Sequence, residues 1–173
     1  LLTRGGGRVF GVSHIIWPDN ENRNAKALSR AAEVCVRLGI PYAALDLRQE
    51  FKTCVIDDFV RTYFGGKTPN PCVRCNERIR FSRFYSRLKE SFEKDGTLQA
   101  GEPLYFATGH YARIKVINGI SYIQKAFDTE KDQSYMLYKI PKEILPFLIF
   151  PLGDLKKEEV VQIAEERGLP SAS

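Results

Sequence analysis

The chain contains 173 residues, with a formal net charge of +5 and a sequence pI near 9.0. The length fits one domain, or one domain and a fragment of a second, and the 43% of hydrophobic residues exclude a disordered chain. The excess of basic residues is a mild indication of a polyanionic partner.

The apolar stretches of the chain are short. The longest, residues 144–152, is interrupted by Pro146 and Pro151 and cannot cross a bilayer, so we expect no membrane partner and a cytoplasmic location. The first residues, Leu-Leu-Thr-Arg-Gly-Gly-Gly, lack an initiator Met and the features of a signal peptide, which indicates a chain entered partway through a fold. Without the Lys-Ser/Thr of a Walker loop, Gly5-Gly6-Gly7 is interpreted as a turn.

Strand and helix patterns alternate through the first half of the chain. Residues 9–16 and 42–47 are apolar runs that predict two buried strands. Between them, small and apolar residues recur at helical spacing and stop at Gly39. A second helix, ending at Gly65, is predicted by an apolar stripe at positions 51, 55, 59, 60 and 63.

A proline-containing loop follows at residues 67–76. Pro69 and Pro71 restrict its backbone, and we expect no helix to pass through it. Apolar residues at offsets 3, 4, 7 and 11 from Phe81 then predict an amphipathic helix. Its basic residues lie largely off the apolar stripe, which fits either a solvated face or a face that contacts phosphates.

The remaining elements are a strand at 104–108, a β-hairpin around Asn118-Gly119, and a helix with Asp154 as N-cap and Gly168 after its end. The alternation predicts an α/β fold: a parallel sheet with flanking helices, a β-hairpin and a helical C-terminal extension. Parallel sheets bind ligands beyond the carboxyl ends of their strands. The segments expected there are residues 14–20, 46–49 and 108–111.

Cys72-Val73-Arg74-Cys75 is the strongest local motif. A zinc knuckle needs two further ligands, and the sequence offers no second Cys pair and only isolated histidines. Two buried structural thiols are a further alternative. A reactive thiol fits best, because Arg74, Arg78 and the N-terminus of the following helix would favour a thiolate.

Two other polar segments are candidate sites. Gly109 allows close approach of a ligand to the backbone, and His110 could donate to a phosphate or a base, although a role within a turn is equally compatible. Residues 131–135 are dense in hydrogen-bonding groups and are also typical of a first helical turn. His14 is interpreted from local sequence as a strand-end residue and Cys35 as core.

Four segments in one order and spacing closely resemble the tRNA-specific 2-thiouridylase family, and the resemblance covers nearly the whole chain. The segments are Gly66-Lys67-Thr68-Pro69-Asn70-Pro71-Cys72-Val73-Arg74-Cys75-Asn76, Ala107-Thr108-Gly109-His110-Tyr111-Ala112-Arg113, Lys131-Asp132-Gln133-Ser134-Tyr135 and Phe150-Pro151-Leu152-Gly153-Asp154-Leu155.

The resemblance implies an adenine nucleotide α-hydrolase-like, Rossmann-like fold of the ATP-pyrophosphatase class. It implies that ATP, with Mg²⁺, adenylates the 2-oxygen of the wobble uridine of tRNA. Sulfur from a protein persulfide, supplied by a sulfur-relay protein or a cysteine desulfurase, then displaces AMP. It further implies a partial catalytic domain at residues 1–138 and the start of a linking region at 139–173.

By position, the resemblance assigns Cys75 as the catalytic cysteine and Asn70, Pro71 and Cys72 as contacts of the target base. It assigns Gly109 to ATP, and it places His14 where many members carry a Met against the adenine. The tRNA contacts that it implies are His110, Lys131, Asp132 and Gln133. Arg78, Arg83 and Arg87 of the basic helix are then expected to follow tRNA phosphates.

Departures from the family pattern leave alternatives open. The nucleotide loop Ser-Gly-Gly-x-Asp-Ser is expected just before Leu1 and a second catalytic cysteine beyond Ser173, so this polypeptide alone is expected to be inactive. Because many members carry Asp at position 72, the pair Cys72 and Cys75 raises an iron-sulfur cluster as a hypothesis. A non-catalytic RNA-binding relative and an ATP-pyrophosphatase-class ligase with another acceptor are the rival functions.

Overall fold

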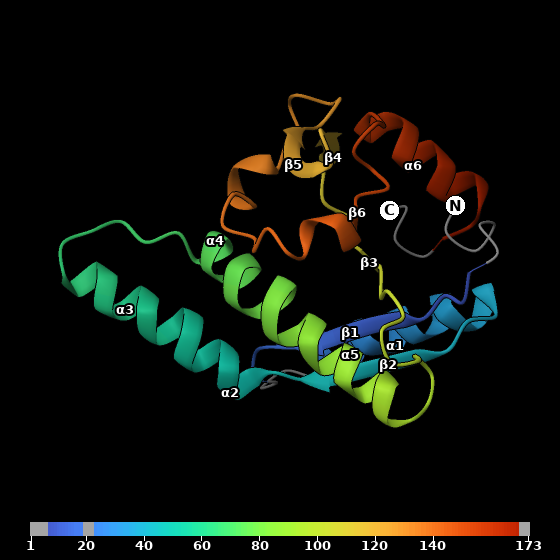
Figure 1. Ribbon diagram of the computed structural model, residues 1–173, viewed down its shortest axis with the longest axis horizontal. Helices are drawn as coiled ribbons and strands as arrows, with labels where there is room; N and C mark the ends of the chain where they lie inside the picture. Colours follow the sequence, from blue (N-terminus) through green and yellow to red (C-terminus); the bar gives the residue numbers. More distant parts are fainter. Residues whose placement is uncertain (1–6, 19–22, 170–173) are drawn as a thin grey trace.

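The computed structural model describes residues 7–18 and 23–169 (Figure 1). Gly5 and Gly6, residues 1–4 and the loop positions Asp19 and Asn20 lie outside the described residues. The predicted α/β class is confirmed, with parallel strand pairing and helices on both sides. The described strands form three two-stranded sheets, β1 with β2, β3 with β6, and β4 with β5, instead of one continuous sheet.

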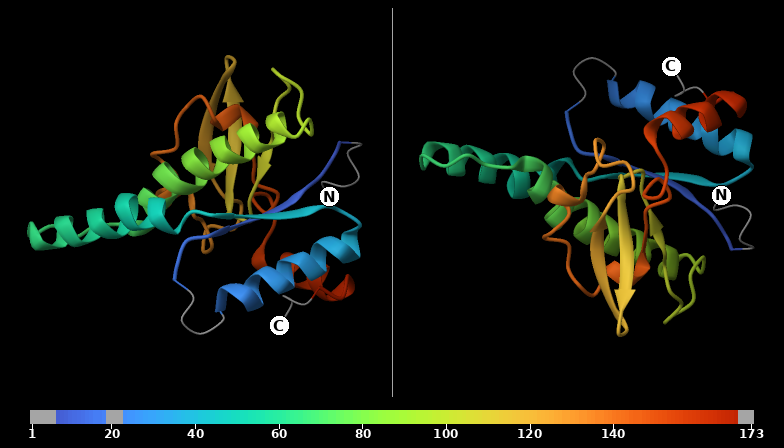
Figure 2. Two further views of the ribbon diagram at one scale, coloured as in Figure 1. Left: turned by 90° about the horizontal axis from the view of Figure 1, so that it is seen from below. Right: turned by 90° about the horizontal axis from the view of Figure 1, so that it is seen from above.

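Strand β1, Gly11–Ile15, pairs in parallel with β2, Tyr42–Asp46. Helix α1, Arg23–Leu38, connects them and covers one face, while the helix that carries α5 covers the other (Figure 2). Gly39 ends α1 with a φ of 65°, which a glycine adopts without strain. Both strands and the helix therefore lie where the sequence predicts them.

A helical arm leaves β2 and projects from the rest of the molecule (Figures 1 and 2). It consists of α2, Arg48–Phe51, the π-helical segment η2, Lys52–Ile56, and α3, Asp57–Phe64. The predicted helix is confirmed, but its apolar stripe is buried only near the base. Val55 is 2% exposed, whereas Tyr63 is 67% and Phe64 85% exposed.

A second long helical stretch returns through the molecule. It begins with α4, Pro71–Cys75, continues as the π-helical segment η3, Asn76–Phe84, and ends with α5, Tyr85–Lys94. The expectation of no helix through residues 67–76 is wrong from Pro71 onward. Pro71 occupies the first turn, where its missing N–H costs no hydrogen bond, and Asn70 Oδ1 accepts the Val73 N–H at 3.1 Å.

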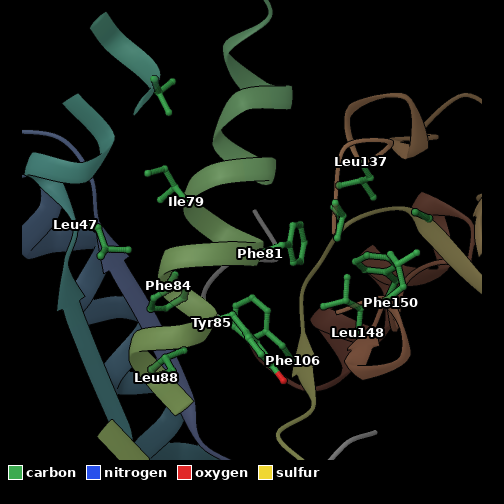
Figure 3. Packing of buried hydrophobic residues seen from close by; sticks show 14 residues of the cluster. Leu47, Ile79, Phe81, Phe84, Tyr85, Leu88, Phe106, Leu137, Leu148 and Phe150 are labelled. Atoms are coloured by element: carbon green, nitrogen blue, oxygen red, sulfur yellow. The ribbon is translucent and has the colours of Figure 1, made fainter. Parts of the chain in front are cut away.

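The core forms around this second helix (Figure 3). Phe84 and Leu88 point toward β1 and β2, while Phe81 points toward Leu148 and Phe150 on the other side. Phe81 and Ile79 are fully buried. Helix η3 is thus fixed between the two parallel strand pairs, and its side chains reach both.

The C-terminal part starts with β3, Phe106–Ala107, followed by the hairpin of β4, Ala112–Ile117, and β5, Ile120–Lys125. Asn118 and Gly119 both have positive φ, which confirms the predicted hairpin turn. The short helices η4 and η5 follow at Ser134–Met136 and Leu145–Phe147.

Strand β6, Leu148–Ile149, pairs in parallel with β3, so residues beyond the predicted boundary at 138 contribute to the same fold. The division at 138 itself stays a prediction. Helix α6, Lys157–Glu166, begins later than expected, and the prediction of Asp154 as N-cap is wrong. Asp154 pairs with Arg113, while Asp128 Oδ2 accepts the Lys157 N–H at 2.9 Å. Within 7–18 and 23–169, no helix is long and apolar enough to cross a membrane.

Candidate functional site

A cleft of about 380 Å³ lies between η3 and the strands β1 and β3. Val12 and His14 line it from β1, Arg80 and Phe84 from η3, residues 106–110 from β3 and the loop after it, and Gln133 from the loop before η4. Two of the three predicted ligand segments meet here, at His14 and at residues 108–110. Residues 46–49 do not line this cleft.

A second cavity of about 380 Å³ lies on the opposite side of β1, against α1, and Cys35 and Tyr42 are among its lining residues. It contains none of the predicted site residues. Cys35 is buried there, as the sequence predicts. We therefore place the candidate site in the first cleft.

Arg80 is the centre of a hydrogen-bond network in the cleft. Its Nη1 donates to Asn76 Oδ1 at 3.2 Å and lies 3.1 Å from His110 Nε2. Because a guanidinium only donates, His110 Nε2 must accept, and the proton of the neutral ring is on Nδ1. That Nδ1–H then donates to Thr108 Oγ1 at 2.8 Å. Helix η3 is in this way connected to the end of β3.

Both histidines of the cleft are neutral near pH 7. Burial, and secondly the positive charge of Arg80, lowers the pKa of His110 to about 4 and that of His14 to about 4. His110 is packed against Phe81 and Phe150, and the His14 ring lies 5.0 Å from that of Phe84. Both nitrogens of His110 have partners inside the protein, so its contact with tRNA stays a prediction.

Cys75 lies in the second turn of the helix that begins at Pro71, half-buried against the core. Burial raises the pKa of its thiol, the charge of Arg80 opposes this shift, and Cys72 adds to it. The prediction that Arg74 and Arg78 favour the thiolate is wrong. Arg74 is bound to Asp58 and Glu77, and Arg78 is directed to Glu77, so Arg80 is the cation that acts on this sulfur.

Asn70, Pro71 and Cys72 are exposed at the start of the same helix. Cys72 is three residues before Cys75, and the part of the chain that the structure describes holds no group of three His, Cys, Asp or Glu residues that could bind a metal. A cluster would need more ligands than these two thiols. The iron-sulfur hypothesis depends on a third ligand from outside these residues and stays a prediction.

The predicted segment 131–133 divides into three roles. Asp132 organises its own loop, because its carboxylate accepts from Ala126 N at 2.8 Å and from Ser134 Oγ at 2.7 Å. Gln133 exchanges two hydrogen bonds with the Tyr111 backbone and lines the cleft. Lys131 is exposed.

The three arginines predicted to contact phosphates differ in how firmly partners inside the protein hold their side chains. Arg87 is held by Glu50 at 2.7 Å and by the Asp46 carbonyl at 3.1 Å. Arg78 lies 3.9 Å from Glu77, and Arg83 donates to the Arg78 carbonyl at 3.4 Å. Arg78 and Arg83 are therefore the better candidates for contact with a nucleic acid.

Parallel strand pairs with helices on both sides and a cleft at their carboxyl ends define an α/β domain of the nucleotide-binding type. A family model described as the tRNA methyl transferase HUP domain matches residues 1–173, and the chain belongs to this family. The predicted membership of the adenine nucleotide α-hydrolase-like class is confirmed.

Curated relatives agree with the resemblance seen in the sequence. The tRNA-specific 2-thiouridylase MnmA of Acidithiobacillus ferrooxidans is 41% identical over 177 residues, covering 100% of this chain and 47% of the relative. The proteins of the same name from Dehalococcoides mccartyi and Helicobacter hepaticus are each 41% identical, covering 98% and 96% of this chain and 46% and 45% of theirs. The chain thus spans about half the length of these relatives.

Sequence reasoning missed two members of the network, Asn76 and Arg80, and it placed Thr108 in the ligand segment 108–111 without its hydrogen bond to His110. A signal was present, because positions 76, 80 and 84 have the spacing of one helical face. The signal was lost because the helix was expected to begin after the proline-containing loop, which separated Asn76 from Arg80.

Proposed function

We propose that this chain is the nucleotide-binding and thiol-bearing part of an ATP-dependent tRNA 2-thiouridylase. The observation that carries the proposal is the position of Cys75. It is half-buried on the helix that also supplies Arg80 to the cleft, and it lies beside the exposed segment from Asn70 to Cys72. A nucleotide in the cleft and a base at the helix start would then flank one thiol.

The cleft is suited to a nucleotide bound near the ends of β1 and β3. The His14 ring, which packs against Phe84, offers aromatic surface, and Gly109 leaves its backbone accessible. A Cβ added at Gly109 would meet only Leu152 Cδ1, at 3.7 Å, so packing does not require a glycine there. The described lining contains no carboxylate, and Mg²⁺ would therefore enter with the phosphates of ATP.

The proposed reaction has two steps. The uridine 2-oxygen attacks the α-phosphorus of ATP, and the bond to pyrophosphate breaks. The outer sulfur of a persulfide then attacks C2, and the C2–O bond breaks so that AMP leaves with that oxygen. The thiolate of the second cysteine, expected beyond Ser173, attacks the inner persulfide sulfur and breaks the S–S bond, which leaves sulfur on C2 and a protein disulfide that an external thiol reduces. AMP is a far better leaving group than an unactivated oxygen of the ring.

The raised pKa of the Cys75 thiol bears on the second step. Because burial raises its pKa, the thiol is protonated at neutral pH, and the nucleophilic thiolate is a minor form. A persulfide formed on this sulfur is more acidic than a thiol and would ionise more readily in the same place. We propose that Cys75 carries the transferred sulfur, with the donor protein loading it.

Replacement of Cys75 by Ser in the full-length protein tests the proposal. With ATP, unmodified tRNA and a persulfide donor, the variant should form no 2-thiouridine by mass spectrometry of digested tRNA, while tRNA binding stays within about twofold. Cys54→Ser, a change at another half-buried cysteine, is the matched control and should remain active. Continued thiolation by Cys75→Ser would refute the assignment. Absence of thiolation by the unaltered protein, with tRNA still bound, would favour a non-catalytic RNA-binding relative.

A further inference from the structure

Arg80 differs from Arg74 and Arg87 of the same helical stretch in its partners. Arg74 and Arg87 are each bound to a carboxylate, at 3.0 Å and 2.7 Å. The contacts of Arg80 within the described residues are with neutral groups, Asn76 Oδ1 and His110 Nε2, and no ion pair there involves it. Its positive charge is therefore not compensated inside the protein.

The surroundings of Arg80 leave this charge facing the cleft. The described lining has no Asp or Glu, and His14 and His110 are neutral at physiological pH. Arg80 is thus the charged side chain in the described lining. An anion that enters the cleft meets one cation in an environment that is partly shielded from water, where a charge-assisted hydrogen bond is strong.

The guanidinium also has donors to spare. It carries five N–H groups, and both described contacts use Nη1. The Nη2 and Nε groups retain three N–H bonds, in the planar arrangement that matches two oxygens of a phosphate. Asn76 and His110 hold one edge of the guanidinium and leave the other edge for a ligand.

We propose that Arg80 binds a phosphate of the nucleotide in the cleft, and that Asn76 and His110 orient its guanidinium for this contact. The proposal rests on the proposed use of ATP and adds the residue that recognises the anion. Thr108 supports the arrangement because it accepts the His110 Nδ1–H and so keeps Nε2 free to accept from Arg80.

The same residue connects the phosphate to the thiol. Arg80 is five residues after Cys75 in a stretch with π-helical geometry, in which residues five apart lie on one face. Its positive charge opposes the rise that burial causes in the pKa of the Cys75 thiol. A phosphate held by Arg80 would therefore lie on the side of the helix that bears the thiol.

Titration calorimetry with ATP, AMP and adenosine tests this assignment on the full-length protein. Arg80→Gln, which keeps a hydrogen-bond donor for Asn76 but removes the charge, should weaken ATP and AMP at least about tenfold. The affinity for adenosine should stay within about twofold of that of the unaltered protein, which would also show that the cleft is intact. Lys94→Gln, at an exposed lysine in the last turn of the same helical stretch, is the matched control and should bind all three like the unaltered protein.

A second variant distinguishes the loss of the positive charge from a folding defect as the cause of weaker ATP binding. Arg80→Lys restores the cation and should bind ATP more tightly than Arg80→Gln. Unchanged ATP affinity in Arg80→Gln, equal losses for ATP and adenosine, or no recovery in Arg80→Lys would each overturn the role of Arg80. Failure of the unaltered protein to bind ATP at all would instead overturn the proposed function.

Discussion

The two long helical stretches have similar sequence patterns but differ in the burial of their apolar faces. Both are amphipathic, but the arm from Arg48 to Phe64 exposes most of its apolar stripe, while the stretch from Pro71 to Lys94 buries its own between two strand pairs. Cys75 and Arg80 lie on the second. In the proposed function, a thiol and a cation act at one reacting centre and need a rigid support, and of these two stretches the buried one provides it.

Truncation of one aromatic residue in each helix should show the largest contrast. Phe81 is fully buried in contact with Phe106 and Phe150, so Phe81→Ala should reduce the free energy of unfolding by about 3–5 kcal/mol. Phe64 is 85% exposed, and Phe64→Ala should change it by less than about 0.5 kcal/mol. Urea denaturation followed by circular dichroism measures both. Comparable losses would mean that the arm is covered in solution.

The pH dependence of stability should localise to the buried helix and its strand contacts. The folded pKa of His110 is about 4, and its ordinary value is 6.5. Between these values the unfolded chain binds the proton and the folded protein does not, so stability is fully present above pH 6.5 and falls as the pH drops toward 4. The loss on this account is on the order of 3 kcal/mol by pH 4.

Urea denaturation at several pH values between 7 and 4 measures this loss. His110→Gln should make the free energy of unfolding depend less steeply on pH over that window. Part of the remaining dependence should come from His14, whose pKa is also lowered. A slope unchanged by His110→Gln would show that this histidine is protonated in the folded protein.

The sequence predicted the elements better than their surroundings. Periodicity and glycine placement indicated α1, the hairpin at Asn118-Gly119 and both strands of the first pair, because these depend on local preferences. Burial of the apolar stripe on the second helix and exposure on the first depend on which strands lie nearby, which no local pattern encodes. The helix start at Pro71 was missed because a proline stops a preceding helix but favours a new one at its first position.

The site shows the same division. Cys75, Gly109 and Gln133 were named from motifs, yet Arg80, which lines the cleft with Gly109 and Gln133 and lies on the helix of Cys75, was treated only as one of several basic side chains. Arg80 differs from Arg78 and Arg83 by its direction, and direction depends on the helix start and on the π-helical geometry of η3. Asp58 and Glu50, which pair with Arg74 and Arg87, come from the arm and its base, whereas Glu77, the other partner of Arg74, lies on the same helix.

The smallest expected effect concerns the exposed basic residues. We predict that Arg78→Gln combined with Arg83→Gln weakens tRNA binding and lowers the slope of log K against log salt by up to about one for each arginine that contacts a phosphate. Arg61→Gln on the arm is the control, because Arg61 is exposed but paired with Asp58. Filter binding between low and moderate salt measures the slope. If the double variant keeps the original slope while Arg61→Gln lowers it, the tRNA lies along the projecting arm. The exposed aromatic residues of the arm are then the surface that the nucleic acid covers.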